Sequence, residues 1–179
     1  ARFIHAQQNV YTHDLLDTLA DRLDEITPAS IDTFFFANTS DEVIEVAVKV
    51  AKQATGRHSI VVLDGAFHGR TNLCMGLTGK VVPYKKGFGP FTPGIYHAPF
   101  PAAYLGVSTG ASLAALDALF ASDIQPDQVA AVIVEPVQGE GGFYPAPAKF
   151  LQALRQLCDE HGIVLIVDEI QSGFARTGT

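Results

Sequence analysis

The spacing of apolar residues predicts helices over residues 12–26, 38–56 and 147–162, and a further helix is expected over about residues 111–121. In the first, four leucines recur at helical spacing before Pro28: Leu15, Leu16, Leu19 and Leu23. The second is expected to open after Asn38 and to end at Gly56. Its predicted buried face consists of Val43, Ala47, Val50 and Ala54.

The helix over residues 147–162 has clear signals at both ends. Pro147 suits the first turn of a helix, and Gly162 suits its end. Its predicted buried face consists of Phe150, Leu151, Leu154, Leu157 and Cys158.

Short apolar runs between these segments predict buried strands over residues 33–37, 59–63, 130–134 and 163–167. Residues 79–106 are rich in Gly, Pro and aromatic residues, so we expect a long ordered loop there with a strand near residues 94–97. Strands that are apolar throughout and are joined by amphipathic helices are typical of a parallel sheet covered on both faces. The predicted fold class is therefore α/β.

Polar side chains follow three of the predicted strands directly. The strand at 59–63 leads into residues 65–70, the strand at 130–134 into residues 135–142, and the strand at 163–167 into residues 168–171. Ligands of parallel α/β sheets bind beyond the carboxyl ends of the strands. If these strands are neighbours, a guanidinium, an aromatic ring and several carboxylates converge there. A single carboxylate after a strand is more often a turn or helix-capping residue, so the prediction depends on all three endings together.

Three motifs resemble the class III aminotransferases of pyridoxal phosphate (PLP) fold type I. They are Gly65 to Thr71 (GAFHGRT), Val134 to Gly142 (VEPVQGEGG) and Val167 to Gly178 (VDEIQSGFARTG). The segments Leu77-Thr78-Gly79-Lys80-Val81, Pro83-Tyr84 and Gly87-Phe88-Gly89-Pro90 look most like the 4-aminobutyrate aminotransferase branch. The resemblance extends over essentially all 179 residues, and three motifs in this order are highly specific for the class.

The resemblance implies PLP as the cofactor and assigns several residues to it. A negative partner keeps the pyridine nitrogen protonated, a role that falls on Asp168, whose alternative is a helix cap. Phe67 and Ile170 would cover the two faces of the ring, although Phe67 has an ordinary core position as its alternative. Gln171 would bind the phenolic oxygen, or else be an exposed turn residue.

His68 and Glu135 complete the predicted surroundings of the ring. Glu135 is expected to support the hydrogen bonding of the site. For His68 two interpretations remain open, a catalytic group and a buried histidine that supports the site from behind.

The substrate residues implied by the resemblance are Arg70 and Glu140. A planar guanidinium can bind a carboxylate through two parallel hydrogen bonds, so Arg70 is expected to hold the substrate carboxylate, with a surface arginine as the alternative. Glu140 resembles the family's switch carboxylate, which pairs with an arginine further along the chain than Thr179. When glutamate binds, this carboxylate moves aside and frees that arginine, so one pocket accepts both ω- and α-amino acids.

The predicted phosphate site departs from the family pattern. The family presents Ser-Gly-Ala or a close variant at the helix start, where backbone N–H groups bind the phosphate. Here the same positions read Thr39-Ser40-Asp41. Thr39 and Glu42 predict a capping box, so the helix start is expected to survive. Asp41 adds a negative charge close to a dianion, which disfavours binding unless the side chain points away.

We expect the sequence to be an internal piece, residues 1–179 forming part of a PLP-binding large domain truncated at both ends. It opens at Ala1 and trails off at Arg176-Thr177-Gly178-Thr179 without a closing element. The family's Schiff-base lysine lies beyond the Asp168 motif, and the six lysines present lie in other contexts. This piece alone is therefore not expected to transaminate.

Composition narrows the partners. The formal net charge of -7 and the absence of a Lys/Arg block argue against nucleic acid or an anionic membrane. No apolar run approaches the roughly 18 residues that a membrane helix needs. Cys74 and Cys158 lack metal-ligand spacing, so we expect no metal site but two inert thiols in a reducing, cytoplasmic compartment.

The predicted activity of the intact protein is amino-group transfer from 4-aminobutyrate or a similar ω-amino acid to 2-oxoglutarate. Its partners would be a small amino acid, a 2-oxo acid and, by resemblance, a second copy of the chain in a homodimer. The alternatives are an acetylornithine or ornithine aminotransferase and a non-catalytic PLP-binding protein on the same fold. A generic nucleotide-binding domain ranks last, because no glycine-rich phosphate motif follows a strand.

Overall fold

The computed structural model describes residues 10–178, which belong to two units, Ala1–Phe36 and Ala37–Thr179. In the first unit, the predicted helix is present as α1 (Asp14–Asp24), and His13 caps its start by accepting a hydrogen bond from the N–H of Leu16. None of the residues of α1 is buried.

The strand predicted over residues 33–37 is wrong. These residues have no regular secondary structure, and the side chain of Phe35 is 58% exposed. A strand requires a neighbouring strand to bind its N–H and C=O groups, and no described strand pairs with this segment.

The second unit is built on a parallel sheet in the order β2-β1-β3-β6. Its strands are β1 (Ser59–Leu63), β2 (Ile95–Ala98), β3 (Val129–Val134) and β6 (Val164–Val167). Val61 of β1 lies opposite Tyr96 on one side and Val132 on the other, and Val132 also faces Leu165. The predicted parallel sheet is therefore confirmed, including the strand near residue 95.

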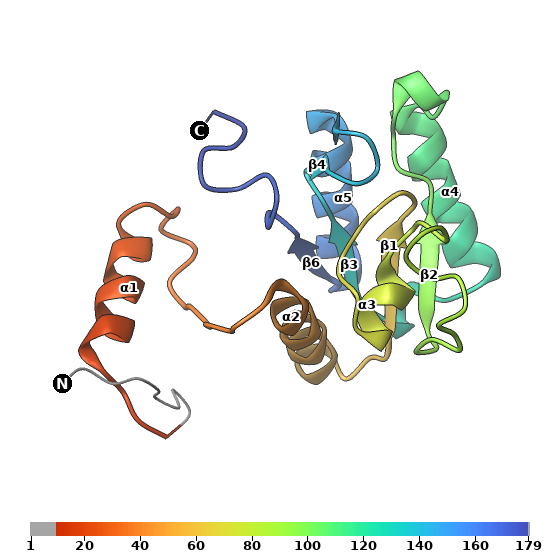
Figure 1. Ribbon diagram of the computed structural model, residues 1–179. Helices are drawn as coiled ribbons and strands as arrows, with labels where there is room; N and C mark the ends of the chain where they lie inside the picture. The colour runs from red at the N-terminus through yellow and green to blue at the C-terminus, as the bar shows by residue number, and fades with distance from the viewer. Residues whose placement is uncertain (1–9, 179) are drawn as a thin grey trace. The chain divides into compact units, whose positions relative to one another are not determined.

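Helices cover both faces of this sheet, which confirms the α/β class (Figure 1). α2 (Ser40–Thr55) and α3 (Asn72–Leu77) pack on one face, while α4 (Thr109–Ser122) and α5 (Ala148–His161) pack on the other. The remaining elements are short: η1 (Ala103–Leu105), η2 (Pro126–Gln128), β4 (Val137–Gln138) and β5 (Tyr144–Pro145). β4 and β5 form an antiparallel hairpin between β3 and α5.

α2 forms where it was predicted, but its predicted buried face is wrong. The buried residues are Ile44, Val48 and Ala51, whereas Val50 is 60% exposed. Both sets are apolar at helical spacing and differ by one position, which rotates the buried face by about 100°. The stripe with Ile44 and Val48 packs against β1 and β3, so the sheet contact decides between the two faces.

β6 is less buried than its apolar sequence predicts. Its first three residues are half-buried and Val167 is exposed. Among the described strands, β6 pairs with β3 alone, so it has a neighbour on one side only.

One arginine binds together the segments at the amino ends of the strands. Nη1 of Arg57 donates to the carbonyl oxygens of Pro126 and Val129, at 3.4 and 3.1 Å. It also donates to the carbonyls of His161 and Gly162, at 2.9 and 3.2 Å. These acceptors belong to η2, the start of β3 and the end of α5, so the two hydrogens of Nη1 are shared among carbonyl groups from three elements.

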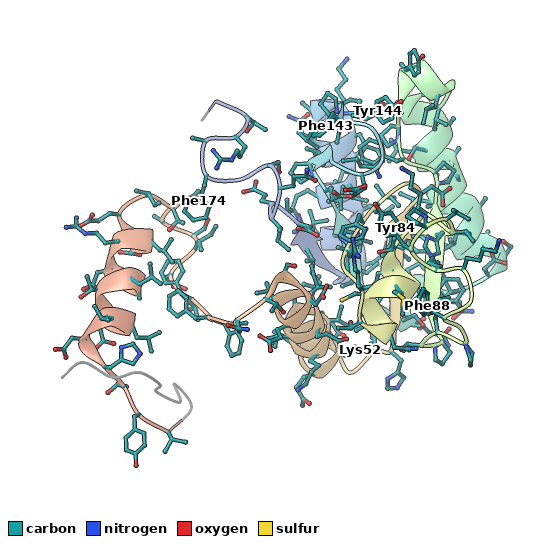
Figure 2. All side chains as sticks on the ribbon, in the orientation of Figure 1. Lys52, Tyr84, Phe88, Phe143, Tyr144 and Phe174 are labelled. Carbon is teal, nitrogen blue, oxygen red and sulfur yellow. The ribbon has the colours of Figure 1, made fainter. Side chains whose placement is uncertain are left out.

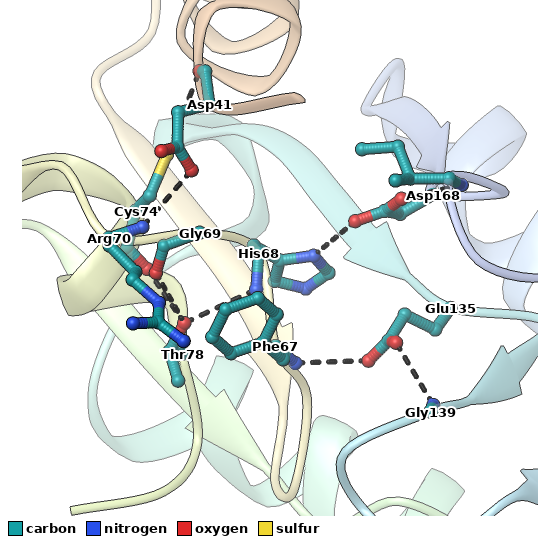
Figure 3. A network of polar contacts seen from close by, with 11 residues as sticks. Asp41, Phe67, His68, Gly69, Arg70, Cys74, Thr78, Glu135, Gly139 and Asp168 are labelled. Atoms are coloured by element: carbon teal, nitrogen blue, oxygen red, sulfur yellow. Dashed lines mark hydrogen bonds and ion pairs between the residues drawn. The ribbon is translucent and has the colours of Figure 1, made fainter. Parts of the chain in front are cut away.

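A buried carboxylate connects two loops at the opposite edge of the sheet (Figure 3). Oε2 of Glu135 accepts from the N–H of Phe67 at 3.0 Å, and Oε1 accepts from the N–H of Gly139 at 3.2 Å. Glu135 follows β3, and Phe67 follows β1. Each carboxylate oxygen thus has its own donor.

Both cysteines are buried and free, as predicted. Burial raises the pKa of the Cys74 thiol and of the Cys158 thiol to about 11. Both thiols are therefore protonated at neutral pH, which makes them poor nucleophiles. Among the described residues, no helix has the combination of length and apolar character that crossing a bilayer requires.

The two faces of α2 can be distinguished by one pair of substitutions. Val48→Ala removes buried methyl groups and should lower the free energy of unfolding by about 2 kcal/mol. Val50→Ala makes the same chemical change on the exposed face and should alter it by less than about 0.5 kcal/mol. Urea unfolding of the intact protein measures both, and equal effects would contradict the rotation described.

Glu135→Gln should destabilise the protein by about 1–2 kcal/mol, because the NH2 group of glutamine cannot accept from the second N–H group, whereas both oxygens of a carboxyl group, ionised or protonated, can accept. The buried N–H of Gly139 or the half-buried N–H of Phe67 would then lack a partner. Thermal and urea unfolding at neutral pH measure this loss.

The variant Glu135→Gln also tests how the stability of the protein depends on pH. Burial raises the pKa of Glu135 above its ordinary value, although the N–H groups of Phe67 and Gly139 act in the opposite direction. Between the unfolded and folded pKa values the folded protein binds a proton that the unfolded chain does not. The cost of ionised Glu135 is therefore complete above the folded pKa and is relieved as the pH falls. As the pH falls through this window, the free energy of unfolding of the wild type should rise relative to that of Glu135→Gln. A relative fall would contradict the raised pKa of Glu135.

Candidate active site

A cavity of about 320 Å³ lies at the carboxyl ends of the strands. Small-molecule sites commonly measure about 300–1,000 Å³. Residues from α2, from the loops after β1 and β3, and from the segment after β6 line it: Ser40, Phe67, His68, Gly69, Glu135, Glu140, Asp168, Ile170 and Gln171. The structure thus brings the three predicted strand endings together, because β1, β3 and β6 are neighbours.

Asp168 is 7% exposed and lies in the wall of this cavity. Its N–H donates to the carbonyl of Val134 at 2.8 Å, which fixes it to the end of β3. Its Oδ1 accepts from the N–H of Ile170 at 3.1 Å, and its Oδ2 lies 2.8 Å from Nδ1 of His68. Both oxygens are therefore held, and the carboxylate has a fixed orientation (Figure 3).

His68 is buried between Asp168 and the core. Its backbone N–H donates to Oγ1 of Thr78 at 3.2 Å, and Thr78 is itself completely buried. Nδ1 faces Asp168, while Nε2 is buried without a hydrogen-bond partner. A buried polar atom without a partner is costly. Because the side chain of His68 is 0% exposed, only a water enclosed beside Nε2 can provide the missing partner.

Phe67, Ile170 and Gln171 present the surfaces that a flat ligand would need. Phe67 is half-buried and Ile170 is exposed, and both line the cavity. The side chain of Gln171 lies so close to Gly139 that a Cβ at position 139 would collide with Oε1. Gly139 is therefore required for Gln171 to occupy this place.

The start of α2 keeps free donors although its sequence departs from the family pattern. Thr39 and Glu42 form the predicted capping box, in which Oγ1 of Thr39 accepts from the N–H of Glu42. The N–H groups of Ser40 and Asp41, in the first turn, have no partner among the described residues. Ser40 lines the cavity, whereas Thr39 and Asp41 do not.

The carboxylate of Asp41 points to the loop after β1. Its Oδ1 accepts from the N–H of Arg70 at 3.0 Å (Figure 3). Gly69 has a φ of +121°, and a Cβ at this position would collide with Oδ1 of Asp41. Asp41 can therefore take this position only because residue 69 is a glycine. The hydrogen bond directs the carboxylate of Asp41 to the backbone N–H of Arg70.

Arg70 lies beside the cavity but not in its lining. Its guanidinium is 6.0 Å from the ring centre of Phe67 and 5.7 Å from that of Tyr84. No carboxylate of residues 10–178 forms an ion pair with it. The cation is therefore held by aromatic rings and is available to an external carboxylate.

Glu140 lies in the cavity wall and is exposed to solvent. Its Oε2 accepts a hydrogen bond from the hydroxyl of Tyr84, and its carbonyl accepts from Nζ of Lys80 at 2.6 Å. The backbone and the side chain of Glu140 are thus both bound by the loop that follows α3.

Sequence reasoning missed Tyr84, Thr78, Gly69 and Gly139 as parts of this site. Tyr84 and Thr78 lie within the segments that resemble the 4-aminobutyrate branch, which was the signal available for them. The two glycines lie within the other motifs, but the collisions that require them are visible only in three dimensions.

The residues of the cavity fit PLP, the group that the resemblance implies. PLP needs an anion at its ring nitrogen, apolar surfaces on both faces of the ring, and N–H donors for its phosphate. Asp168, the pair Phe67 and Ile170, and the start of α2 have these properties. No group of three or more metal-ligating side chains occurs within residues 10–178.

Comparison with known proteins identifies the family of this chain. The model of the family "Aminotransferase class-III" matches residues 1–179. The chain is 43% identical to the 5-aminovalerate aminotransferase DavT of Pseudomonas putida over 176 residues, which are 98% of this chain and 41% of that protein. It is 48% identical to the 4-aminobutyrate aminotransferase GabT of Escherichia coli over 141 residues, 79% of this chain and 33% of that protein.

A solved structure has the same fold. The taurine:2-oxoglutarate aminotransferase from Bifidobacterium kashiwanohense, in complex with PLP and glutamate, superposes with a TM-score of 0.87 at 29% identity. The match covers 95% of this chain and 40% of that one. The chain thus spans less than half the length of these relatives. Because the family model matches every residue, the chain belongs to the class III aminotransferases.

Proposed function

We propose that the intact protein containing this segment transfers an amino group from an ω-amino acid such as 4-aminobutyrate to 2-oxoglutarate, with PLP as its cofactor. The observation that carries this proposal is the buried Asp168, bound by His68 in the wall of a cavity of a class III aminotransferase. Relatives named for 5-aminovalerate and 4-aminobutyrate support an ω-amino donor.

Asp168 would face the ring nitrogen of the cofactor and hold a proton there. When bound, PLP supplies an electron sink for the carbon that loses its proton. The orientation of Asp168 is fixed because Oδ1 accepts from the N–H of Ile170 and Oδ2 lies 2.8 Å from Nδ1 of His68. His68 would therefore act mainly by holding Asp168 in place.

The other residues would position the ligands. Phe67 and Ile170 would cover the faces of the ring, and Gln171 would bind the phenolic oxygen. The first-turn N–H groups at Ser40 and Asp41, with the hydroxyl of Ser40, would hold the phosphate at the start of α2. Glu135 would keep the loops after β1 and β3 in register.

Arg70 would bind the carboxylate of the amino donor, for which its guanidinium has no competing ion pair among the described residues. An ω-amino acid carries its amine several bonds away from its carboxylate. A carboxylate held at Arg70, beside the cavity, therefore allows the amine to enter it. Glu140 would act as the switch, pairing with an arginine outside the present sequence and moving aside for glutamate.

We also propose the wider setting. Residues 1–179 would be part of the PLP-binding large domain, consistent with the partial coverage of the relatives. The intact protein would be a homodimer, which the exposed apolar side chains of Tyr104, Leu105 and Phe143 support. A cytoplasmic location is supported by the two free cysteines.

The proposed activity predicts that the intact protein with PLP forms glutamate from 2-oxoglutarate and 4-aminobutyrate or 5-aminovalerate. Ornithine, acetylornithine and diaminobutyrate should react at least about tenfold more slowly in kcat/KM. A coupled glutamate assay measures the panel. Preference for acetylornithine or ornithine would support the rival activity, and no turnover of any donor would support a non-catalytic protein.

Asp168→Asn should lower kcat by a factor on the order of a hundred or more, because the amide cannot stabilise a proton on the ring nitrogen. Glu169→Gln is a matched control, since Glu169 is the neighbouring exposed carboxylate and does not line the cavity. Single-turnover measurements on both variants separate chemistry from binding. Equal losses in the two variants would contradict the role of Asp168.

Asp41→Asn should lower the PLP concentration needed for half-saturation by about fivefold. The amide keeps an oxygen that can accept from the N–H of Arg70, while the negative charge near the proposed phosphate site at the start of α2 is removed. Equilibrium titration of the apoprotein with PLP measures this affinity. A weaker affinity would show that the charge of Asp41 assists the site.

A further inference from the structure

Tyr84 contacts both of the residues that are proposed to bind substrate carboxylates or respond to them, Arg70 and Glu140. It lies on the loop between α3 and β2 (Figure 2). The ring of Tyr84 packs on the ring of Phe67, with 4.8 Å between the two ring centres. The guanidinium of Arg70 lies 5.7 Å from the centre of the Tyr84 ring. The hydroxyl of Tyr84 donates to Oε2 of Glu140. The ring of Tyr84 thus contacts Arg70, and its hydroxyl contacts Glu140.

The loop that carries Tyr84 is fixed at two further points. Nζ of Lys80 donates to the carbonyl of Glu140, and Nζ of Lys85 donates to the carbonyl of Thr78 at 3.0 Å. Lys85 also lies 5.4 Å from the ring centre of Phe91. Since the loop is bound on both sides of Tyr84, the position of its phenol is defined by its surroundings.

We propose that Tyr84 is a positioning residue that sets the choice between ω-amino donors and dicarboxylate substrates, by holding Arg70 with its ring and Glu140 with its hydroxyl. This inference rests on the function proposed above. It goes further because it assigns two separable parts of one side chain to two different substrates.

The physical basis is the repulsion between carboxylates. A dicarboxylate that binds near Glu140 brings a second negative charge toward it, so Glu140 must move. The hydrogen bond from Tyr84 opposes that movement, because the carboxylate loses a donor when it leaves. The same bond raises the pKa of the Tyr84 phenol above its ordinary value. A donor with a single carboxylate bound at Arg70 does not require this movement.

Tyr84→Phe tests the hydroxyl alone. It keeps the ring against Phe67 and Arg70, so KM for the ω-amino donor should stay within about twofold. KM for glutamate and 2-oxoglutarate should fall about fivefold, since Glu140 is released more readily. Each half-reaction is followed separately through the absorbance of the bound cofactor in the intact holoenzyme.

Tyr84→Leu tests the ring. Arg70 then loses one of its two aromatic neighbours, so KM for the ω-amino donor should rise about tenfold, while the effect on glutamate should resemble that of Tyr84→Phe. Tyr96→Phe is the matched control, because the hydroxyl of Tyr96 in β2 has no hydrogen-bond partner among the described residues and does not line the cavity. This control should change neither half-reaction.

A titration separates failure of this inference from failure of the proposed function. Ultraviolet difference spectra of the wild type against Tyr84→Phe report the ionisation of the Tyr84 phenol without any turnover. Its pKa should lie above that of an ordinary tyrosine, and Glu140→Gln should lower it. If the phenol titrates normally, or if Tyr84→Phe changes both half-reactions equally or neither, the inference is overturned. If the phenol titrates as expected but the wild type converts no substrate, the proposed function is what fails.

Discussion

The parallel pairing of β1, β3 and β6 is the constraint on which the site depends. Each strand is followed directly by a polar segment, and the shared direction places all three segments at one edge. His68 and Asp168, which are one hundred residues apart in sequence, therefore meet at 2.8 Å. An antiparallel arrangement of the same strands would send one of them to the opposite edge.

Carboxylates in and around this site are bound mainly by backbone N–H groups. Glu135 accepts from Phe67 and Gly139, Asp41 accepts from Arg70, and Asp168 accepts from Ile170. The second oxygen of Asp168 lies 2.8 Å from Nδ1 of His68. Backbone donors stabilise a buried charge without bringing a full positive charge. The guanidinium of Arg70 consequently forms no ion pair with these carboxylates.

Much of the fold was predictable from the sequence. The strand at residues 130–134 is apolar throughout and that at 59–63 is apolar after Ser59, and the helix at 147–162 has Pro147 and Gly162 at its ends. What failed depends on neighbours. The aromatic run at residues 33–37 has strand-like residues without a pairing strand, and α2 has two apolar faces between which only the sheet decides.

The site was predictable in its residue types and less so in its contacts. The motifs contain eight of the nine lining residues, while Ser40 came from the helix start. The bond between His68 and Asp168 and the contacts of Tyr84 were not predictable, because each joins segments that are distant in sequence. The direction of Asp41 likewise depends on Gly69, because a Cβ at that position would collide with Oδ1 of Asp41.

The guanidinium of Arg57 has a consequence for how this fold can change. It binds carbonyls from η2, β3 and the end of α5 at the amino ends of the strands, whereas the cavity lies at their carboxyl ends. Arg57 thereby connects three elements at the amino ends of the strands, while the loops at the carboxyl ends carry the residues that line the cavity. Substitutions in the ligand-facing loops accordingly leave the four carbonyl contacts of Arg57 in place.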